Sequence, residues 1–166
     1  MTLCFMIGLS RNILFSERML SAFDDWSKNG GKDLSSQKIG IIGVGHIGKE
    51  VISLLKPFGC EVLVNDIYDQ SDYYRQVGVQ EASKEDIYRS ANIISIHTTL
   101  NESTRRMINA EVLTKMRSDT YLINVARGEI IDQEALKIVL LNKKIAGAAV
   151  DVFDVEPSDD KEFLNL

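Results

Sequence analysis

The glycine-rich segment Gly43-Val44-Gly45-His46-Ile47-Gly48 has the spacing of a loop that can hold a pyrophosphate. In such a GxGxxG loop the first glycine makes a tight turn, the second lets the backbone approach the phosphates, and the third lets helix and strand pack closely. The free N–H groups and the positive end of the helix dipole then face the ligand. The glycines alone are a weak signal, because glycines also serve ordinary turns. Their position between an apolar run (Lys38 to Gly43) and helical spacing (His46 to Lys56) strengthens it.

An acidic residue follows at the distance that a nucleotide site requires. Asp66 lies 66 minus 48, or 18, residues after Gly48, at the end of the next predicted strand. A carboxylate at this place accepts hydrogen bonds from the adenosine ribose hydroxyls and repels a 2′-phosphate. The two features together predict a dinucleotide site that prefers NAD to NADP. The alternative is that Asp66 is only a solvated residue at the end of a strand.

A second motif, Asn124 to Asp132 (NVARGEIID), follows a predicted central strand. Ligands of open α/β sheets bind outside the carboxyl ends of the strands, so Arg127 is placed where a substrate would lie. Its planar, permanently charged guanidinium suits a carboxylate held beside a reacting carbonyl. The alternative is a surface arginine in a salt bridge. Asp132 is expected to be the N-cap of the next helix.

A third motif, Ala148 to Pro157 (AAVDVFDVEP), follows the last predicted strand. Asp151 is flanked by apolar residues, and a carboxylate in that setting needs a partner if it is buried. Glu156 stands on a loop fixed by Pro157, where it could orient a nearby imidazole and raise the pKa of that ring. The alternative for Glu156 is an exposed acid in an acidic tail, and the residues alone leave these two readings equal.

Apolar runs and helical spacing alternate along the chain and indicate an α/β fold, a Rossmann-like doubly wound parallel sheet in a three-layer α/β/α arrangement. Ser83 and Asp86 resemble the capping box of a short helix through Arg89. The polar stretch through Tyr73 and Tyr74 is expected to be irregular. The predicted strands are Lys38 to Gly43, Glu61 to Asn65, Asn92 to His97, Thr120 to Val125 and Ala146 to Val152. Further helices are predicted at His46 to Lys56, from Asn109 or Ala110 to Met116, and at Asp132 to Leu141.

A long helix is predicted to precede this domain. It extends from Thr2 to Phe23, and its apolar side chains need a surface to pack on, which could lie outside this chain. Asn29-Gly30-Gly31 forms the one clear joint after it. We therefore expect a linking helix in residues 1–28, a nucleotide-binding domain in 29–157, and the start of a return segment to another domain in 158–166.

The composition is that of an ordinary globular domain, with 166 residues, 45% hydrophobic and 26% charged. Nineteen Lys and Arg against 24 Asp and Glu give a net charge of -5, which speaks against a nucleic-acid or anionic-membrane partner. Cys4 and Cys60 are too few for a disulfide framework or a zinc site, so no metal and a cytoplasmic location are expected. The opening MTLCFMIGL has neither the flanks of a signal peptide nor the length of a membrane span.

Together these motifs resemble the NAD-binding domain of the D-isomer-specific 2-hydroxyacid dehydrogenases, with phosphoglycerate dehydrogenase-like members most similar. The resemblance covers essentially the whole chain. Members transfer a hydride between NAD and a D-2-hydroxy acid or 2-keto acid, and most dimerise through this domain. The resemblance rests on GVGHIG with Asp66, SIHTTLNEST (Ser95 to Thr104), LINVARGEIID (Leu122 to Asp132), AGAAVDVFDVEP (Ala146 to Pro157) and GLSRNI (Gly8 to Ile13) with Trp26.

The resemblance implies a role for each matching residue. Arg127 would bind the substrate carboxylate and polarise the keto oxygen, and Glu156 would pair with the catalytic histidine. Asp151 would contact the nicotinamide carboxamide, and Asp66 the adenosine ribose. The remaining cofactor-binding positions are Gly43, Gly45, His46, Ile47, Gly48, His97, Thr98, Thr99, Val125 and Ala126.

The sequence also departs from the family pattern. The family's catalytic histidine follows the Glu-Pro motif after a further connection, and neither His46 nor His97 stands at that place. Thr99 and Asn101 replace the family's frequent proline and threonine, so the loop between them is expected to be less rigid. The expected function is therefore that of the NAD-binding domain of a D-2-hydroxyacid dehydrogenase, and the chain is expected to be incomplete for catalysis by itself.

Two other functions are considered. The first is a non-enzymatic NAD-sensing or co-repressor-like module, which would have no evident need for Arg127 and Glu156. The second is another Rossmann-type protein, such as an S-adenosylmethionine-dependent methyltransferase, which the second and third motifs argue against. A homodimer is expected, because the opening apolar helix would be exposed without a partner.

Overall fold

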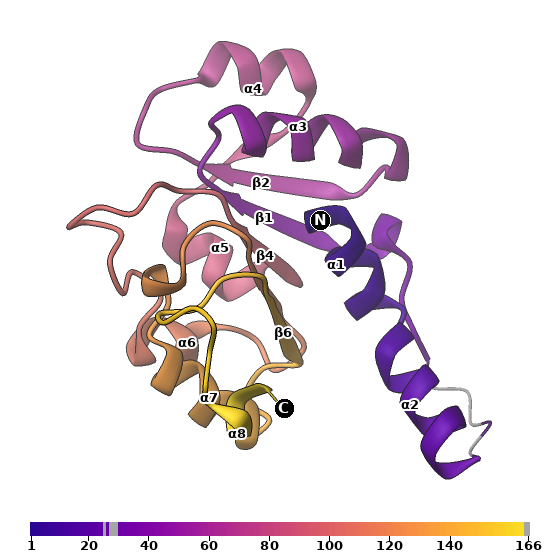
Figure 1. Cartoon of the computed structure of the whole chain (residues 1–166). Coiled ribbons are helices and arrows are strands. Elements are labelled where there is room, and N and C mark those ends of the chain that lie inside the picture. The colour runs from indigo at the N-terminus through magenta and orange to yellow at the C-terminus, as the bar shows by residue number, and fades with distance from the viewer. Residues whose placement is uncertain (25, 27–29, 165–166) are drawn as a thin grey trace.

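The computed structural model describes residues 1–24, 26 and 30–164 and contains one six-stranded parallel sheet (Figure 1). The strand order is β3-β2-β1-β4-β5-β6, so the chain moves outward from β1 in one direction and then in the other. This is the doubly wound arrangement that the alternating pattern predicts. The strands are β1 (Lys38–Ile42), β2 (Glu61–Asn65), β3 (Gln80–Glu81), β4 (Ile93–Ile96), β5 (Tyr121–Asn124) and β6 (Gly147–Val150).

Helices cover both faces of the sheet. Ile93 belongs to the hydrophobic core on one face, and its neighbour Ile94 to the core on the other, as the alternation of side chains along a strand requires. The first core includes side chains of α1 (Thr2–Ser10), α3 (His46–Leu55) and α4 (Ser71–Val77). The second includes α5 (Lys84–Ser90), α6 (Ala110–Lys115), α7 (Gln133–Leu141) and α8 (Lys161–Leu164). The predicted three-layer fold is confirmed.

Side-chain caps start several helices where the sequence places them. The Ser83 hydroxyl accepts a hydrogen bond from the Asp86 N–H at the start of α5. The Asp132 carboxylate accepts one from the Ala135 N–H at the start of α7, which confirms the predicted N-cap. These caps satisfy N–H groups that have no partner within their own helix.

The expectation of one continuous helix from Thr2 to Phe23 is wrong. The chain forms α1 and a second helix, α2 (Ile13–Phe23), with a break at Asn12. Asn12 has a left-handed backbone (φ 53°), which asparagine tolerates better than most residues because its short side chain can form local hydrogen bonds. The Arg11 N–H still donates to the Ile7 carbonyl, so α1 ends immediately before the turn.

The expectation of an irregular segment around Tyr73 and Tyr74 is also wrong, because these residues lie in α4. The Asp69 carboxylate accepts a hydrogen bond from the Ser71 N–H just before the helix. Gly78 ends the helix with a left-handed backbone (φ 78°), a conformation that glycine adopts without steric cost. The short α4 packs Tyr74 into the core beside β2.

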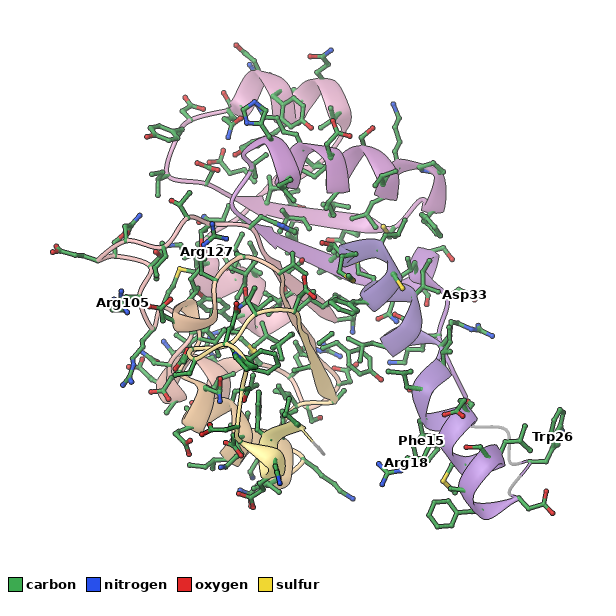
Figure 2. All side chains as sticks on the ribbon, in the orientation of Figure 1. Phe15, Arg18, Trp26, Asp33, Arg105 and Arg127 are labelled. Atoms are coloured by element: carbon green, nitrogen blue, oxygen red, sulfur yellow. The ribbon has the colours of Figure 1, made fainter. Side chains whose placement is uncertain are left out.

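Helix α2 extends away from the sheet (Figure 1). None of its described side chains is buried, whereas Met6 of α1 is fully buried. Phe15 and Trp26 lie far from the sheet in Figure 2 and are 56% and 81% exposed. We call Ile13–Phe23 together with Trp26 the apolar arm. None of the helices in the described part of the chain is both long enough and apolar enough to cross a membrane.

The chain returns from the apolar arm to the point where it left. The Lys32 N–H donates to the Ser10 carbonyl (2.7 Å), and Arg11 pairs with Asp33 (2.8 Å). A Cβ on Gly31 would lie 2.8 Å from the Arg11 Cα, so the two backbones are in close contact. Asn29, in the predicted joint, lies outside the described residues.

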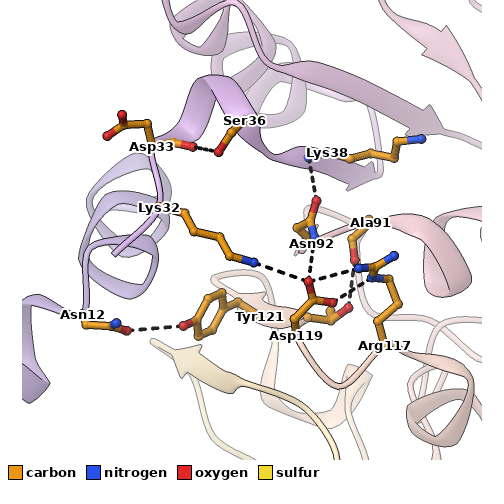
Figure 3. A network of polar contacts seen from close by, with 11 residues as sticks. Asn12, Lys32, Asp33, Ser36, Lys38, Ala91, Asn92, Arg117, Asp119 and Tyr121 are labelled. Atoms are coloured by element: carbon orange, nitrogen blue, oxygen red, sulfur yellow. Dashed lines mark hydrogen bonds and ion pairs between the residues drawn. The ribbon is translucent and has the colours of Figure 1, made fainter. Parts of the chain in front are cut away.

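A polar network fixes this return to the amino-terminal edge of the sheet (Figure 3). The Asp119 carboxylate accepts hydrogen bonds from Arg117 (2.7 Å), Asn92 (3.2 Å) and Lys32 (3.5 Å). Mainly because of Arg117, the pKa of Asp119 falls to about 2. Asn92 also accepts from the Lys38 N–H (3.0 Å), so one cluster connects the returning chain to β1.

Candidate functional site

The predicted site residues lie at the carboxyl-terminal edge of the sheet, because every strand pair is parallel. Their contacts form two groups. One contains the glycine-rich loop with the residues after β2 and β4, and the other contains the residues after β5 and β6. By strand, the predicted positions are Gly43, Gly45, His46, Ile47 and Gly48 after β1, Asp66 after β2, His97, Thr98 and Thr99 after β4, Val125, Ala126 and Arg127 after β5, and Asp151 and Glu156 after β6.

The three glycines of the loop have three different surroundings. Gly43 has φ 96°, and a Cβ there would lie 2.7 Å from the carbonyl of His97. A Cβ on Gly48 would overlap the Gly43 carbonyl oxygen, so the start of α3 packs directly on the loop. A Cβ on Gly45 would meet no described atom within 4 Å. Space is therefore open at the glycine that is expected to face a pyrophosphate.

The amino terminus of α3 can receive an anion. Gly45 is its N-cap and supplies no side-chain acceptor for the first N–H groups of the helix. His46 and Ile47 are exposed there, whereas Gly48 is buried. Unsatisfied N–H groups and the helix dipole make such a terminus favourable for phosphate.

Asp66 is half-buried and contacts the glycine-rich loop directly. Its Oδ2 accepts a hydrogen bond from the Val44 N–H (2.5 Å), and its Oδ1 accepts one from the Tyr68 N–H (3.0 Å). Each carboxylate oxygen can accept more than one hydrogen bond, so these contacts leave capacity for ribose hydroxyls. The Gln70 side chain donates to the Val44 carbonyl (3.1 Å), so Val44 is held on both of its backbone groups.

His97 follows β4 and is a neutral group in this fold. Burial lowers the pKa of His97 to about 4, and its Nε2 lies 2.9 Å from the hydroxyl of fully buried Ser95. The neighbouring Thr98 hydroxyl is buried and has no hydrogen-bond partner among the described residues. A buried hydroxyl without a partner is costly, and a bound polar ligand at this edge could satisfy it.

The loop after Thr98 has its own hydrogen bonds where the family often has proline. The Thr104 hydroxyl donates to the Thr99 carbonyl (2.7 Å). The Asn101 side chain accepts from the Ser103 N–H (2.9 Å) and from the Thr104 N–H (3.2 Å). These bonds hold the loop against the residues that follow it.

Arg127 is exposed at the edge of the sheet and is far from the apolar arm (Figure 2). Its backbone is set by Asn124, which is buried at the end of β5. The Asn124 side chain donates to the Arg127 carbonyl (2.8 Å) and accepts from the Ala126 N–H (3.0 Å). The guanidinium donates to the Ala126 carbonyl (2.6 Å), which leaves other donors of its fork free for an anion.

The loop after β6 packs against the residue that follows Arg127. A Cβ on Gly128 would overlap the Phe153 backbone, so only glycine permits this contact. Asp151 is exposed, so it needs no buried partner. Glu156 is also exposed and accepts a hydrogen bond from the Phe153 N–H (3.0 Å), which folds the loop back on itself.

The C-terminal segment supports the same loop. The Phe153 and Phe163 rings pack edge to face, with their centroids 6.3 Å apart. Lys137 of α7 contacts Asp160 and Glu162, each at 3.1 Å, just before and within α8. The residues after the third motif are therefore anchored to α7, and they hold the loop with Asp151 and Glu156 beside Gly128.

Two residues of this site were not foreseen as functional. Gln70 follows β2 in a segment that was expected to be irregular, and its contact with Val44 connects positions 26 residues apart. Asn124 lies within a predicted motif, where a polar residue buried at a strand end was the available signal. Among the described residues, no group of three or more His, Cys, Asp or Glu side chains could hold a metal ion.

Comparison with known proteins agrees with this geometry. Residues 3–166 match the family model of the D-isomer specific 2-hydroxyacid dehydrogenase, NAD binding domain. The chain is 37% identical over 143 residues to a D-3-phosphoglycerate dehydrogenase of Bacillus subtilis, covering 85% of this chain and 27% of that protein. It is 31% identical over 169 residues to a D-lactate dehydrogenase of Lactiplantibacillus plantarum, covering 95% and 51%.

Solved structures show the same similarity. A D-lactate dehydrogenase from Sporolactobacillus superposes with a TM-score of 0.86 at 33% identity, covering 98% of this chain and 52% of that one. An NAD-complexed D-isomer specific 2-hydroxyacid dehydrogenase from Lactobacillus delbrueckii gives 0.87 at 28% identity, covering 97% and 52%. The chain thus spans about half the length, or less, of these relatives. It belongs to the D-isomer-specific 2-hydroxyacid dehydrogenase family and forms the NAD-binding domain of that family.

Proposed function

We propose that this chain binds NAD along the carboxyl-terminal edge of its sheet, as the nucleotide-binding part of a dehydrogenase that acts on a small D-2-hydroxy or 2-keto acid. The observation that carries the proposal is the open space at Gly45 beside the uncapped start of α3. In this arrangement Gly45, His46 and Ile47 bind the pyrophosphate and Asp66 binds the adenosine ribose. Thr98, Val125, Ala126 and Asp151 line the nicotinamide half of the groove.

NAD would supply the hydride chemistry when bound, and the protein would supply orientation and charge. Arg127 would hold the substrate carboxylate through the donors that its contact with Ala126 leaves free. Glu156 would orient a general acid/base histidine. Neither histidine of this chain fits that role, since His46 belongs to the phosphate loop and His97 is neutral and only partly exposed. We therefore propose that the chain alone is incomplete for catalysis.

The cofactor proposal predicts measurable binding with a defined preference. Calorimetric titration should give a dissociation constant for NAD in the micromolar to millimolar range, with weaker binding of NADP. Replacing Asp66 with alanine removes the ribose acceptor and one support of the Val44 peptide. We expect it to weaken NAD binding by about tenfold, as the loss of hydrogen bonds to a charged group predicts.

The same titration can contradict the proposal. Asp72, which is exposed at the start of α4, gives the matched control, and Asp72→Ala should bind NAD as the wild type does. Equal affinity for NAD and NADP would refute the assigned role of Asp66. Turnover of D-2-hydroxy acids by this chain alone, lost in Arg127→Ala, would show that it is catalytically complete.

We further propose that the chain forms a homodimer through the apolar arm. Leu14, Phe15 and Phe23 are 78%, 56% and 65% exposed on a helix with no buried side chain, which is unusual for a helix without a partner.

The proposed function also includes a role for each segment of the chain. Residues 1–28 would link to another domain, residues 29–157 would bind the nucleotide, and residues 158–166 would begin the return to that other domain. The net charge and the two free cysteines support a cytoplasmic protein without a nucleic-acid or membrane partner.

Light scattering tests the dimer. The wild-type chain should have twice the mass of a monomer, and Phe15→Glu should shift it to the monomer, because a buried unpaired charge is costly at an interface. Phe58→Glu is the matched control, since Phe58 is 36% exposed on a different surface, and it should remain dimeric. A wild-type chain that stays monomeric at high concentration would contradict the proposal.

A further inference from the structure

The two backbone groups of Val44 are both held from the connection between β2 and α4. Asp66 accepts a hydrogen bond from the Val44 N–H (2.5 Å), and Gln70 donates one to the Val44 carbonyl (3.1 Å). Val44 itself is 1% exposed, so its side chain is anchored in the core. The peptide groups before and after Val44 are therefore both fixed in orientation.

The contact from Gln70 also determines where the next N–H points. The Val44 carbonyl and the Gly45 N–H belong to one peptide group, which is trans, since within the described residues only Glu156-Pro157 is cis. In a trans peptide group the carbonyl and the N–H point in opposite directions. Because Gln70 holds the Val44 carbonyl on the side of α4, the Gly45 N–H is directed away from α4.

The opposite orientation of this peptide group would harm a phosphate site. Gly45 has no Cβ and no neighbour within 4 Å at the place of one, so its own backbone offers little resistance to rotation. A rotated peptide would present the Val44 carbonyl oxygen where the Gly45 N–H now points. An oxygen with partial negative charge would repel a phosphate that an N–H group attracts.

We propose that Gln70 is a positioning residue that keeps the Gly45 N–H available to the pyrophosphate of NAD. This inference deepens the proposed function and rests on its placement of the pyrophosphate at Gly45. Gln70 acts through the Val44-Gly45 peptide group and does not itself contact the cofactor. Asp66 fixes the preceding peptide group, so the two side chains together set the orientation of the loop before α3.

The experiment compares a ligand that has the pyrophosphate with one that lacks it. NAD and adenosine are titrated separately into the wild type, Gln70→Ala and Gln70→Met, and methionine keeps the length of the side chain without its donor. Both variants should weaken NAD binding by about five- to tenfold, which is the effect of one hydrogen bond of ordinary strength. Adenosine binding should change by less than about twofold, since adenosine has no phosphate to be repelled.

The matched control is Gln76→Ala, because Gln76 is an exposed glutamine of α4, the helix whose N-cap is Gln70. It should bind both ligands as the wild type does. Unchanged NAD affinity in both Gln70 variants, or an equal loss for NAD and adenosine, would overturn the positioning role while the proposed function stands. If the wild type binds no NAD, the proposed function fails and this inference fails with it.

Discussion

Replacing Gly45 with valine is expected to reduce NAD affinity by at least about 100-fold, or about 2.8 kcal/mol. The valine side chain would occupy the space where the pyrophosphate is proposed to bind, and no described protein atom lies within 4 Å of its Cβ. The same open space means that the protein itself has room for the side chain. Calorimetric titration measures the loss of NAD affinity, and chemical denaturation measures the free energy of unfolding.

The free energy of unfolding should fall by no more than about 1 kcal/mol, because valine is a poorer N-cap than glycine. Gly8→Ala is the matched control, since a Cβ on Gly8 of α1 also meets no described atom within 4 Å. That variant should bind NAD normally. Retained NAD affinity in Gly45→Val would place the pyrophosphate elsewhere, and a large loss of stability would show that the space is not open in solution.

Replacing Gly128 with alanine should affect both the fold and the nicotinamide half of the groove. The added Cβ would overlap the Phe153 backbone, which cannot move aside as a flexible side chain can. Overpacking of this kind is expected to lower the free energy of unfolding by about 1–3 kcal/mol. The displaced loop carries Asp151, which is proposed to contact the nicotinamide. ADP-ribose lacks the nicotinamide, so the variant should bind NAD no more tightly than ADP-ribose.

Gly147→Ala separates this effect from glycine replacement in general. A Cβ on Gly147 would lie 3.4 Å from the Tyr121 ring, which is ordinary van der Waals contact, so stability should be unchanged or slightly increased. Denaturation curves for the two variants give the comparison directly. If Gly128→Ala were as stable as Gly147→Ala, the contact between Gly128 and Phe153 would not be required for the fold.

The sheet could be predicted from the sequence because its strands are apolar runs that end at recognisable motifs. After their polar first residues, Lys38 and Asn92, the runs KIGII and NIISI contain only one more polar residue, Ser95, so they fit strands that are buried on both faces. The caps at Ser83 and Asp132 could also be predicted, because their hydrogen bonds are short-range and depend on nearby residues alone.

The break at Asn12 and the helix α4 could not be predicted in this way. A single asparagine inside an apolar helical pattern does not indicate a break, because the left-handed backbone there is stabilised by neighbours such as Tyr121, which is far along the chain. Helix α4 has only seven residues, too few to show a clear period, and tertiary packing of Tyr74 stabilises it.

The site residues also divide into those that the sequence predicts and those that it does not. The glycines, Asp66 and Arg127 stand in motifs whose spacing carries information, and the parallel sheet then places them at one edge. Gln70 and Asn124 act through contacts with backbone groups that folding brings within reach. No local pattern distinguishes Gln70 from a surface glutamine, whereas Asn124 at least ends an apolar run.

The chain leaves the sheet domain after Ser10 to form the apolar arm and returns to it at Lys32, and these two residues are joined by a hydrogen bond. This hydrogen bond lies outside the arm. Substitutions within the arm therefore change its surface without removing the contact that fixes its two ends. The proposed subunit interface on the arm and the proposed NAD site at the carboxyl-terminal edge of the sheet could therefore change independently in evolution.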